Sequence, residues 1–231
     1  MTAAAIFVKT PGLSPLKTRL ARDLGQTAAE QWYLHAAAAV AEAAAAAGLE
    51  AVYWAVAEPE AVDHETWRGL PCLPQGAGSL GARMARVHRA MQERHGAGLL
   101  LGADAPQLDP DWLRTASQWL NSAQPRLCLG PARDGGFWTF GANISISENR
   151  WCAVPYSQAD TRARFEQAMA GLGKWHFLPD LTDVDTASDL VQLGTELAAL
   201  PAPLPEQARL MTEMPRSIQT ALTALSKQVL M

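Results

Sequence analysis

The chain has 231 residues, of which 48% are hydrophobic and 18% charged, and its formal net charge at pH 7 is −4. This composition excludes an intrinsically disordered chain and disfavours a general nucleic-acid binder, which usually carries a basic excess. The three cysteines, Cys72, Cys128 and Cys152, form neither a disulfide framework nor a zinc motif. No apolar run is long enough to cross a membrane and no signal peptide is recognisable, so we expect a cytoplasmic protein without membrane or nucleic-acid partners.

The first part of the chain predicts strands and helices in alternation. The short apolar run Ala3–Val8 is typical of a strand. The alanine-dominated segment Thr27–Ala47 predicts a helix because alanine has the highest helix propensity, and Gly48 marks its end. Two further strands are expected at Leu49–Ala57 and Leu70–Gln75.

The same alternation continues through the second part of the chain. Leu80–Arg94 has apolar residues at helical spacing, and Gly98–Ala103 is typical of a buried strand. Asp109 is expected to cap a helix that begins at Pro110 and runs to Leu120. Two strands and then two helices follow, at Arg126–Gly130, Gly136–Gly141, Asp160–Gly171 and Thr186–Leu200. Thr186 with Asp189 predicts a capping box at the start of the last helix. Strands alternating with helices predict a three-layer α/β/α fold with a mainly parallel, twisted sheet.

The sequence changes character after residue 200. The stretch PAPLPEQ, residues 201–207, contains three prolines and predicts a linker. Ser217–Met231 has apolar residues at helical spacing and predicts a terminal helix, which would pack on the domain or join two subunits in a homodimer. We therefore expect one domain over residues 1–200, followed by a Pro-rich linker and helical tail over residues 201–231.

The segment FVKTPGLSPLKTRLA, residues 7–21, predicts a phosphate site directly after the first strand. It is not a Walker A loop, because Leu16 replaces the second glycine and Pro15 removes a backbone N–H that such a loop needs. Its cations are Lys9, Lys17 and Arg19, with Thr18 between the last two. Ligands bind at the carboxyl ends of the strands in open α/β sheets, so these cations are candidates for binding nucleotide phosphates. A solvated basic loop is the alternative interpretation.

Carboxylates follow two other expected elements. Asp104 ends a buried strand, which would bring it to the sheet edge that carries the lysine loop. Asp183 and Asp185 alternate along an extended segment, so we expect them to point to opposite sides. Carboxylates facing a phosphate site indicate Mg²⁺ or Mn²⁺ as a cofactor. The alternative for Asp104 is that it only caps the following turn.

Five motifs in this order resemble one known family. They are KTPGLSPLKTRLA, QGAGSLGARM, LLLGADAPQL, LGPARDGGFWTFG and DVDTASDL, and they extend from about Ala4 to about Leu193. The chain resembles the GT-A-like transferases named selenodomain-associated or glycosyltransferase-like transferases. These belong to the nucleotide-diphospho-sugar transferase superfamily, which includes the 2-phospholactate guanylyltransferases.

The resemblance implies a role for each matching residue. The nucleotide would contact Lys9, Lys17, Thr18, Arg19, Gln75, Gly76, Gly81 and Arg83. The metal would be held by Asp104 together with Asp183 or Asp185, and the acceptor would face Asp134, Gly135 and Gly136. The residues implied in catalysis are Lys9, Lys17, Arg19 and Asp104. The chain has Asp104-Ala105-Pro106 where sugar transferases of this fold carry a D-x-D, which is a departure from plain glycosyl transfer.

These features together predict a metal-dependent transferase that binds an NTP or a nucleotide sugar. Three cations exceed what a diphosphate needs, which favours nucleotidyl transfer to a small acceptor bearing a phosphate or carboxylate. The alternatives are a glycosyltransferase that uses a nucleotide-sugar donor and a nucleotide-binding protein without catalysis.

Overall fold

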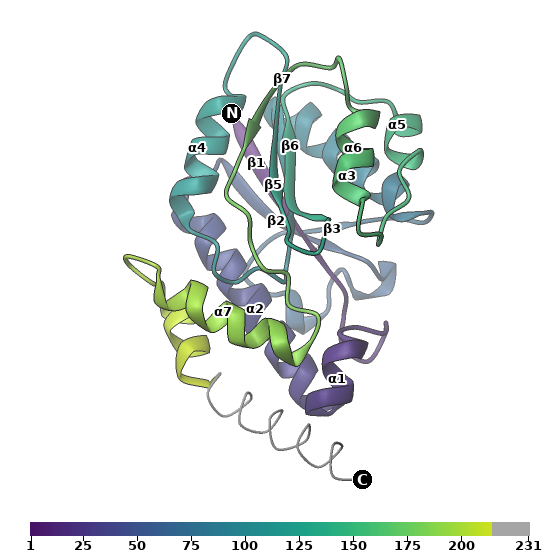
Figure 1. Ribbon diagram of the computed structural model, residues 1–231. Coiled ribbons are helices and arrows are strands. Elements are labelled where there is room, and N and C mark those ends of the chain that lie inside the picture. Colours follow the sequence, from purple (N-terminus) through teal and green to yellow (C-terminus); the bar gives the residue numbers. More distant parts are fainter. Residues whose placement is uncertain (214–231) are drawn as a thin grey trace.

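The structure is a computed structural model, in which residues 1–213 are described, and it contains a seven-stranded sheet between two helical layers (Figure 1). The strands are β1 (Thr2–Val8), β2 (Ala51–Val56), β3 (Cys72–Pro74), β4 (Ala97–Gly102), β5 (Arg126–Pro131), β6 (Phe137–Ala142) and β7 (Lys174–Phe177). The α-helices are α1 (Thr18–Leu24), α2 (Gln26–Ala46), α3 (Leu80–His95), α4 (Pro110–Leu120), α5 (Glu148–Cys152), α6 (Thr161–Ala168) and α7 (Ala187–Ala198).

The sheet has the strand order β3-β2-β1-β4-β6-β5-β7. Within residues 1–213, β6 is the one antiparallel strand, because it pairs in that sense with both β4 and β5. The neighbours of β1 are β2 and β4, both parallel to it, so the carboxyl ends of these three strands lie at the same edge. The predicted three-layer fold with a mainly parallel sheet is confirmed.

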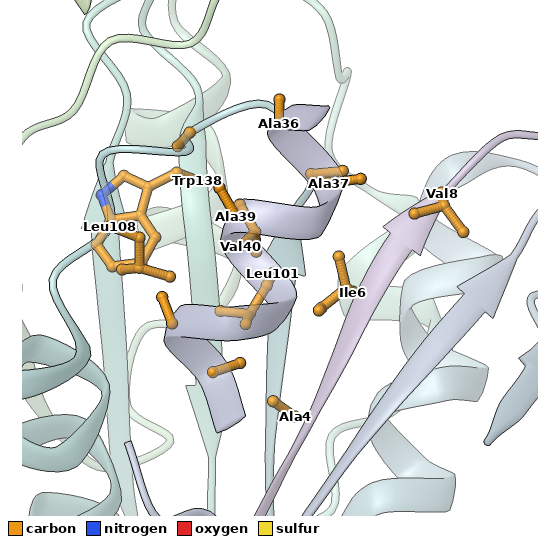
Figure 2. Close-up of a cluster of buried hydrophobic side chains, with 14 of the residues drawn as sticks. Ala4, Ile6, Val8, Ala36, Ala37, Ala39, Val40, Leu101, Leu108 and Trp138 are labelled. Atoms are coloured by element: carbon orange, nitrogen blue, oxygen red, sulfur yellow. The ribbon is translucent and has the colours of Figure 1, made fainter. Parts of the chain in front are cut away.

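The two faces of the sheet are covered by different helices. Helices α2, α4 and α7 lie on one side, and α3, α5 and α6 lie on the other (Figure 1). Figure 2 shows α2 alongside β1, with Ala37 and Val40 on the turns of the helix nearest Ile6. Small side chains let this helix approach the strand closely, so larger residues here would overpack the core at a cost of about 1–3 kcal/mol each.

Three short elements were not predicted from the sequence. These are α1, α5 and β7, which have only seven, five and four residues. Segments of this length contain too few apolar positions to show a period. Two predicted helix caps are confirmed. Asp109 accepts a hydrogen bond from the Asp111 N–H, and Thr186 forms a capping box with Asp189.

The segment predicted as a linker packs on the domain. Residues 205–213 are helical, and the buried Gln207 donates to the carbonyl oxygens of Pro106 (2.9 Å) and Leu108 (2.8 Å). Pro205 begins this helix, where its missing N–H costs nothing. The predicted tail helix, Ser217–Met231, lies outside the described residues, so the proposed boundary at residue 200 and the homodimer stay predictions. None of the helices in residues 1–213 has the length and apolarity needed to cross a membrane.

Candidate functional site

The side chain of Lys17 lies at the centre of a carboxylate cluster. Its Nζ is 2.9 Å from Asp104 Oδ2, 3.3 Å from Asp185 Oδ1 and 3.8 Å from Asp183 Oδ1, and it donates to the Val184 carbonyl oxygen at 2.5 Å. Only 5% of the Lys17 side chain is exposed. The lysine therefore holds together the loop after β4 and the segment before α7.

The backbone of Lys17 is unusual and explains how the side chain reaches inward. Lys17 caps α1 with φ 44°, in the left-handed region that residues other than glycine rarely adopt. Such a conformation costs of the order of 1–3 kcal/mol and persists only where other contacts hold it. Here the ion pairs with the carboxylates are those contacts.

The cluster is unbalanced in charge, with three carboxylates around one buried ammonium. Burial by itself would lower the pKa of Lys17, but the charges of Asp104, Asp183 and Asp185 outweigh it and raise the pKa above its ordinary value. Burial, followed by the charge of Asp104, raises the pKa of Asp183 above its ordinary value, and Lys17 opposes this change. Arg19 adds a second, exposed cation whose Nη1 lies 3.2 Å from Asp185 Oδ2. Three carboxylates therefore face two cations, and with all three ionised the cluster would have one negative charge in excess, which a further cation would offset.

The expectation that Asp183 and Asp185 point to opposite sides was wrong. Both approach Lys17 Nζ, because residues 182–185 do not form a regular strand. The carbonyl of the intervening Val184 also accepts from Lys17, so this short segment curves around the ammonium. The alternation of side chains holds only along a pleated strand.

A cavity of about 260 Å³ adjoins the carboxylate cluster at the carboxyl ends of β1 and β4. Its lining comes from Phe7, Val8, Lys9, Leu16, Lys17, Tyr33, Gln75, Leu80, Arg83, Asp104 and Asp185. The cavity thus joins the lysine loop, α2, the loop before α3 and both carboxylate segments. It combines apolar walls with cations on two sides, as in pockets for small molecules with a charged part.

The lysine loop is fixed at its beginning by two side chains. The N–H of Lys9 donates to the hydroxyl of Tyr33 at 2.9 Å, and the N–H of Thr10 donates to Glu58 Oε2 at 2.9 Å. Burial would raise the pKa of Glu58, but hydrogen bonds from Ser14 and Thr10 outweigh it and lower the pKa. Glu58 therefore stays ionised and holds the loop that carries Lys9 and Lys17.

Gln75 lies at the back of the cavity with its amide group held in one orientation. Its Nε2 donates to the carbonyl oxygens of Val8 (3.3 Å) and Ala55 (2.8 Å). Both amide hydrogens are used in this way, so the side chain has only its acceptor oxygen left for a ligand. The carbonyl of Gln75 accepts from Arg86 at 2.6 Å, which fixes the start of the glycine-rich turn.

Several of the predicted nucleotide contacts do not line the cavity. Thr18 and Arg19, both in α1, are outside the lining, and 69% of the Arg19 side chain is exposed. Gly76 and Gly81 also lie outside the lining, and at each of them the missing side chain lets another residue pack closely against the backbone. A Cβ at Gly76 would meet Arg86, and one at Gly81 would lie 2.6 Å from the Trp151 carbonyl oxygen. Gly76 therefore shapes the turn and Gly81 lets α3 pack closely on α5, and neither glycine lines the cavity.

The predicted acceptor residues form the tight turn between β5 and β6. Asp134 Oδ1 accepts from the Gly136 N–H at 2.8 Å, and Gly135 has φ +90°. A Cβ at Gly135 would clash with the Ala159 carbonyl oxygen at 1.9 Å, so only glycine fits. The Arg133 N–H donates to the Leu181 carbonyl oxygen at 3.0 Å, so this turn lies beside the segment that leads to Asp183 and Asp185.

The carboxylates do not form a ready-made metal site. Within residues 1–213, no group of three or more His, Cys, Asp or Glu side chains is arranged to hold a metal ion. Lys17 stands between Asp104, Asp183 and Asp185 and takes up much of their charge. However, Oδ1 of Asp104 and Oδ1 of Asp183 are buried without a hydrogen-bond partner in this part of the chain. Carboxylate oxygens without a hydrogen-bond partner are ligands that fit Mg²⁺ or Mn²⁺.

Sequence reasoning did not identify Tyr33, Glu58, Leu16 or Leu80. Tyr33 gave a faint signal, since it is the tyrosine in a helix made mostly of alanine. The other three gave none, because a glutamate after a strand and leucines near a helix start are common. The structure is needed to see that they surround the lysine loop and the cavity.

Residues 20–158 match the family described as "Uncharacterized protein conserved in bacteria (DUF2064)". No curated protein matches the chain.

Solved structures share the fold over nearly the whole chain. A "putative nucleotide-diphospho-sugar transferase" from Desulfovibrio desulfuricans superposes with a TM-score of 0.81 at 23% identity, over 95% of this chain and 97% of that one. A nucleotidyl transferase from Methanothermobacter thermautotroptrophicus gives 0.58 at 14% identity, over 87% and 99% of the two chains. A CMP:2-keto-3-deoxy-manno-octonic acid synthetase complexed with CTP gives 0.53 at 14%, over 85% and 98%. At these identities the likeness shows a common fold.

Proposed function

The chain belongs to the DUF2064 family, and we propose that it is a metal-dependent transferase that binds an NTP or a nucleotide sugar and transfers a nucleotidyl group. One observation carries this proposal. Lys9, Lys17, Asp104 and Asp185 meet around a single cavity at the carboxyl ends of parallel strands. This is the place where open α/β sheets bind their ligands, and the side chains there suit a phosphate and a cation.

Different residues of the cavity would bind the phosphates and the base of a nucleotide. Lys9 and Arg83 are the cations that line it without belonging to the carboxylate cluster, so they are the candidates for pairing with phosphate oxygens. Leu16 and Leu80 offer apolar surface for a flat ring, and the acceptor oxygen of Gln75 faces hydrogen-bond donors on a base. A nucleotide has each of these chemical parts.

Asp104, Asp183 and Asp185 are the residues that would hold a divalent ion. Such an ion would neutralise phosphate charge and polarise the phosphorus under attack. The support for this assignment is the pair of buried carboxylate oxygens without a hydrogen-bond partner, together with the gathering of three carboxylates around Lys17.

The choice of nucleotidyl over glycosyl transfer has less support than the choice of ligand. The sequence favoured a triphosphate because of three cations, but Arg19 is outside the cavity lining and Lys17 is engaged with carboxylates. One of the similar structures is named a nucleotidyl transferase, a second is a synthetase complexed with CTP, and a third is named a nucleotide-diphospho-sugar transferase. Nucleotidyl transfer is supported by the first two names and by the absence of the sugar-transferase D-x-D after β4. The acceptor would approach from the Asp134 turn.

The ligand class is tested by thermal shift with NTPs, NDPs and nucleotide sugars, each with Mg²⁺ or Mn²⁺. A ligand present at 100 times its dissociation constant stabilises the fold by about 2.7 kcal/mol, which is several degrees in melting temperature. We expect stabilisation that needs both nucleotide and metal. No shift with any nucleotide would contradict the proposal, and a preference for nucleotide sugars over NTPs would favour the glycosyltransferase alternative.

The phosphate side of the cavity is tested by Lys9→Ala. If Lys9 contacts the terminal phosphates, this variant should weaken binding of an NTP about tenfold, since a charge-assisted hydrogen bond contributes roughly 1.5–3 kcal/mol, and should weaken an NDP less. Lys174→Ala is the control, because Lys174 is an exposed lysine on β7. Isothermal titration of both variants with both nucleotides measures the difference. Equal losses for the two nucleotides would argue against a triphosphate ligand.

A further inference from the structure

Glu196 of α7 is the acceptor for five hydrogen-bond and ion-pair donors. Its Oε2 accepts from Gln107 Nε2 (2.8 Å) and from the Thr182 N–H (3.2 Å). Its Oε1 accepts from Thr182 Oγ1 (2.8 Å) and Gln192 Nε2 (3.0 Å), and lies 3.1 Å from Arg133 Nη2. Only 13% of the Glu196 side chain is exposed.

Four of these donors belong to three residues that lie near carboxylates of the candidate site in the sequence. Gln107 follows Asp104 in the loop after β4, Arg133 precedes Asp134 in the turn after β5, and Thr182 precedes Asp183. Gln107 also donates to the Thr182 carbonyl at 2.9 Å, which ties two of the segments to each other. A single carboxylate thus joins the three segments that carry Asp104, Asp134 and Asp183.

Short backbone hydrogen bonds connect two of these segments, whereas the third, the loop after β4, is connected mainly by side chains. Arg133 N–H donates to the Leu181 carbonyl at 3.0 Å, and Leu181 N–H donates to the Pro131 carbonyl at 3.1 Å. Between the loop after β4 and the segment before α7, the backbone bond is the long one from Val184 to Asp104, at 3.5 Å. The short contacts between these two segments run through the side chains of Gln107 and Glu196, and through Lys17 of the loop after β1.

Stability of α7 does not account for a glutamate at this position. Glu196 lies in the last turn of Ala187–Ala198, where a negative charge opposes the helix dipole. The start of the helix is capped by Thr186 and Asp189, so Glu196 is not needed there. Burial would raise the pKa of Glu196, but its hydrogen bonds with Gln192, Thr182 and Gln107 outweigh it and lower the pKa, which keeps the group ionised.

We propose that Glu196 is a positioning residue that sets the distance between the metal-side carboxylates Asp104 and Asp183 and the acceptor-side turn at Asp134. The inference rests on the proposed function for the roles of these carboxylates. The connection of the three segments through Glu196 rests only on the contacts described above, independently of the proposed function.

The tie is tested first by hydrogen exchange on Glu196→Gln, with the full chain and no ligand. A glutamine has the same shape but presents an amide N–H₂ to donors, so the contacts on one side are lost. We expect amide exchange to rise tenfold or more in all three segments, 104–108, 132–136 and 181–185. Glu42→Gln is the matched control, because Glu42 Oε2 also accepts a backbone N–H, from Glu206 at 2.9 Å, away from the site. A rise confined to α7 would overturn the proposal.

The consequence for the site is measured with Mn²⁺ alone, by titration of the parent, Glu196→Gln and Glu42→Gln. We expect Glu196→Gln to weaken Mn²⁺ binding about tenfold at a temperature where the variant is folded, and Glu42→Gln to leave it unchanged. Equal affinity in parent and Glu196→Gln would overturn the positioning role. If the parent does not bind Mn²⁺, the metal part of the proposed function fails, and the exchange pattern alone decides the tie.

A milder variant covers the case in which Glu196→Gln does not fold. Thr182→Val removes the hydroxyl donor and leaves the glutamate charge and the backbone N–H in place. Exchange should then rise severalfold at 181–185 and at 104–108. Unchanged exchange in both segments would count against the proposal.

Discussion

Lys17 and Asp104 form an ion pair of 2.9 Å between the loop after β1 and the loop after β4. The pair lies where two parallel strands end side by side, and Asp183 and Asp185 approach the same ammonium from the segment before α7. The lysine therefore does in this structure what a bound cation does in other acidic sites, since it keeps like charges together. Its removal should have consequences that differ from those of an ordinary surface lysine.

Lys17→Met should lower the free energy of unfolding by roughly 3–5 kcal/mol, because removing one partner of a buried ion pair leaves the other charges uncompensated. The contacts that hold the left-handed backbone at residue 17 are lost at the same time. Urea denaturation of parent and variant measures the change. Lys174→Met is the control, and its stability should stay within about 0.5 kcal/mol of the parent. A Lys17→Met protein as stable as the parent would show that the carboxylates do not depend on the lysine.

Asp104→Asn should weaken Mn²⁺ binding tenfold or more while changing the melting temperature by only a few degrees. The amide keeps the shape of the carboxylate, and Asp183 and Asp185 still pair with Lys17. The loss of one charge also relieves repulsion on Asp183. Titration with Mn²⁺ and a thermal melt test the two parts separately, and Asp63→Asn on the exposed surface is the control. A variant that unfolds would identify Asp104 as a structural residue.

Tyr33→Phe should reduce nucleotide affinity about fivefold to tenfold at a stability cost of about 1 kcal/mol. The hydroxyl accepts the Lys9 N–H and lines the cavity, so its loss frees the start of the lysine loop. Tyr53→Phe removes a hydroxyl that pairs with His95, away from the cavity, and should leave affinity unchanged. Titration with an NTP and Mg²⁺ compares the two variants. The same loss in both would rule out a specific role for Tyr33.

Stability should fall in mild acid because of His88, which is packed between Phe140 and Trp151. Burial lowers the pKa of His88 to about 4, from an ordinary value of 6.5. The unfolded chain therefore takes up a proton as the pH falls from 6.5 to 4, while the folded chain does not. The contribution of neutral His88 to the free energy of unfolding is therefore complete above pH 6.5 and is lost as the pH falls toward 4. The loss is roughly 3 kcal/mol, since one pKa unit corresponds to 1.36 kcal/mol.

Denaturation at pH 7 and pH 4.5 of the parent and His88→Leu measures this contribution. The variant should lose less stability between the two pH values than the parent does. His64→Gln, at an exposed histidine, should behave like the parent. An identical pH dependence in His88→Leu and parent would contradict the assignment.

The sequence by itself determined the fold class and the edge of the sheet where the site lies. Apolar runs ending at Lys9 and Asp104, separated by helical segments, were sufficient, because parallel strands joined by helices bring their carboxyl ends to one edge. Caps at Asp109 and Thr186 were also readable, since a cap depends on residues within one turn of each other.

Only the tertiary structure decided which way the side chains of the site point. The placement of Lys17 among the carboxylates needs a left-handed backbone and a partner segment at residues 183–185, neither of which leaves a local pattern. Asp183 and Asp185 share a side because their segment is irregular and bends around that ammonium. The five contacts of Glu196, like the docking of Gln207, join residues far apart in the chain. Local sequence sets where strands and helices form, but packing between distant segments sets the direction of each side chain, and the chemistry of the site depends on that direction.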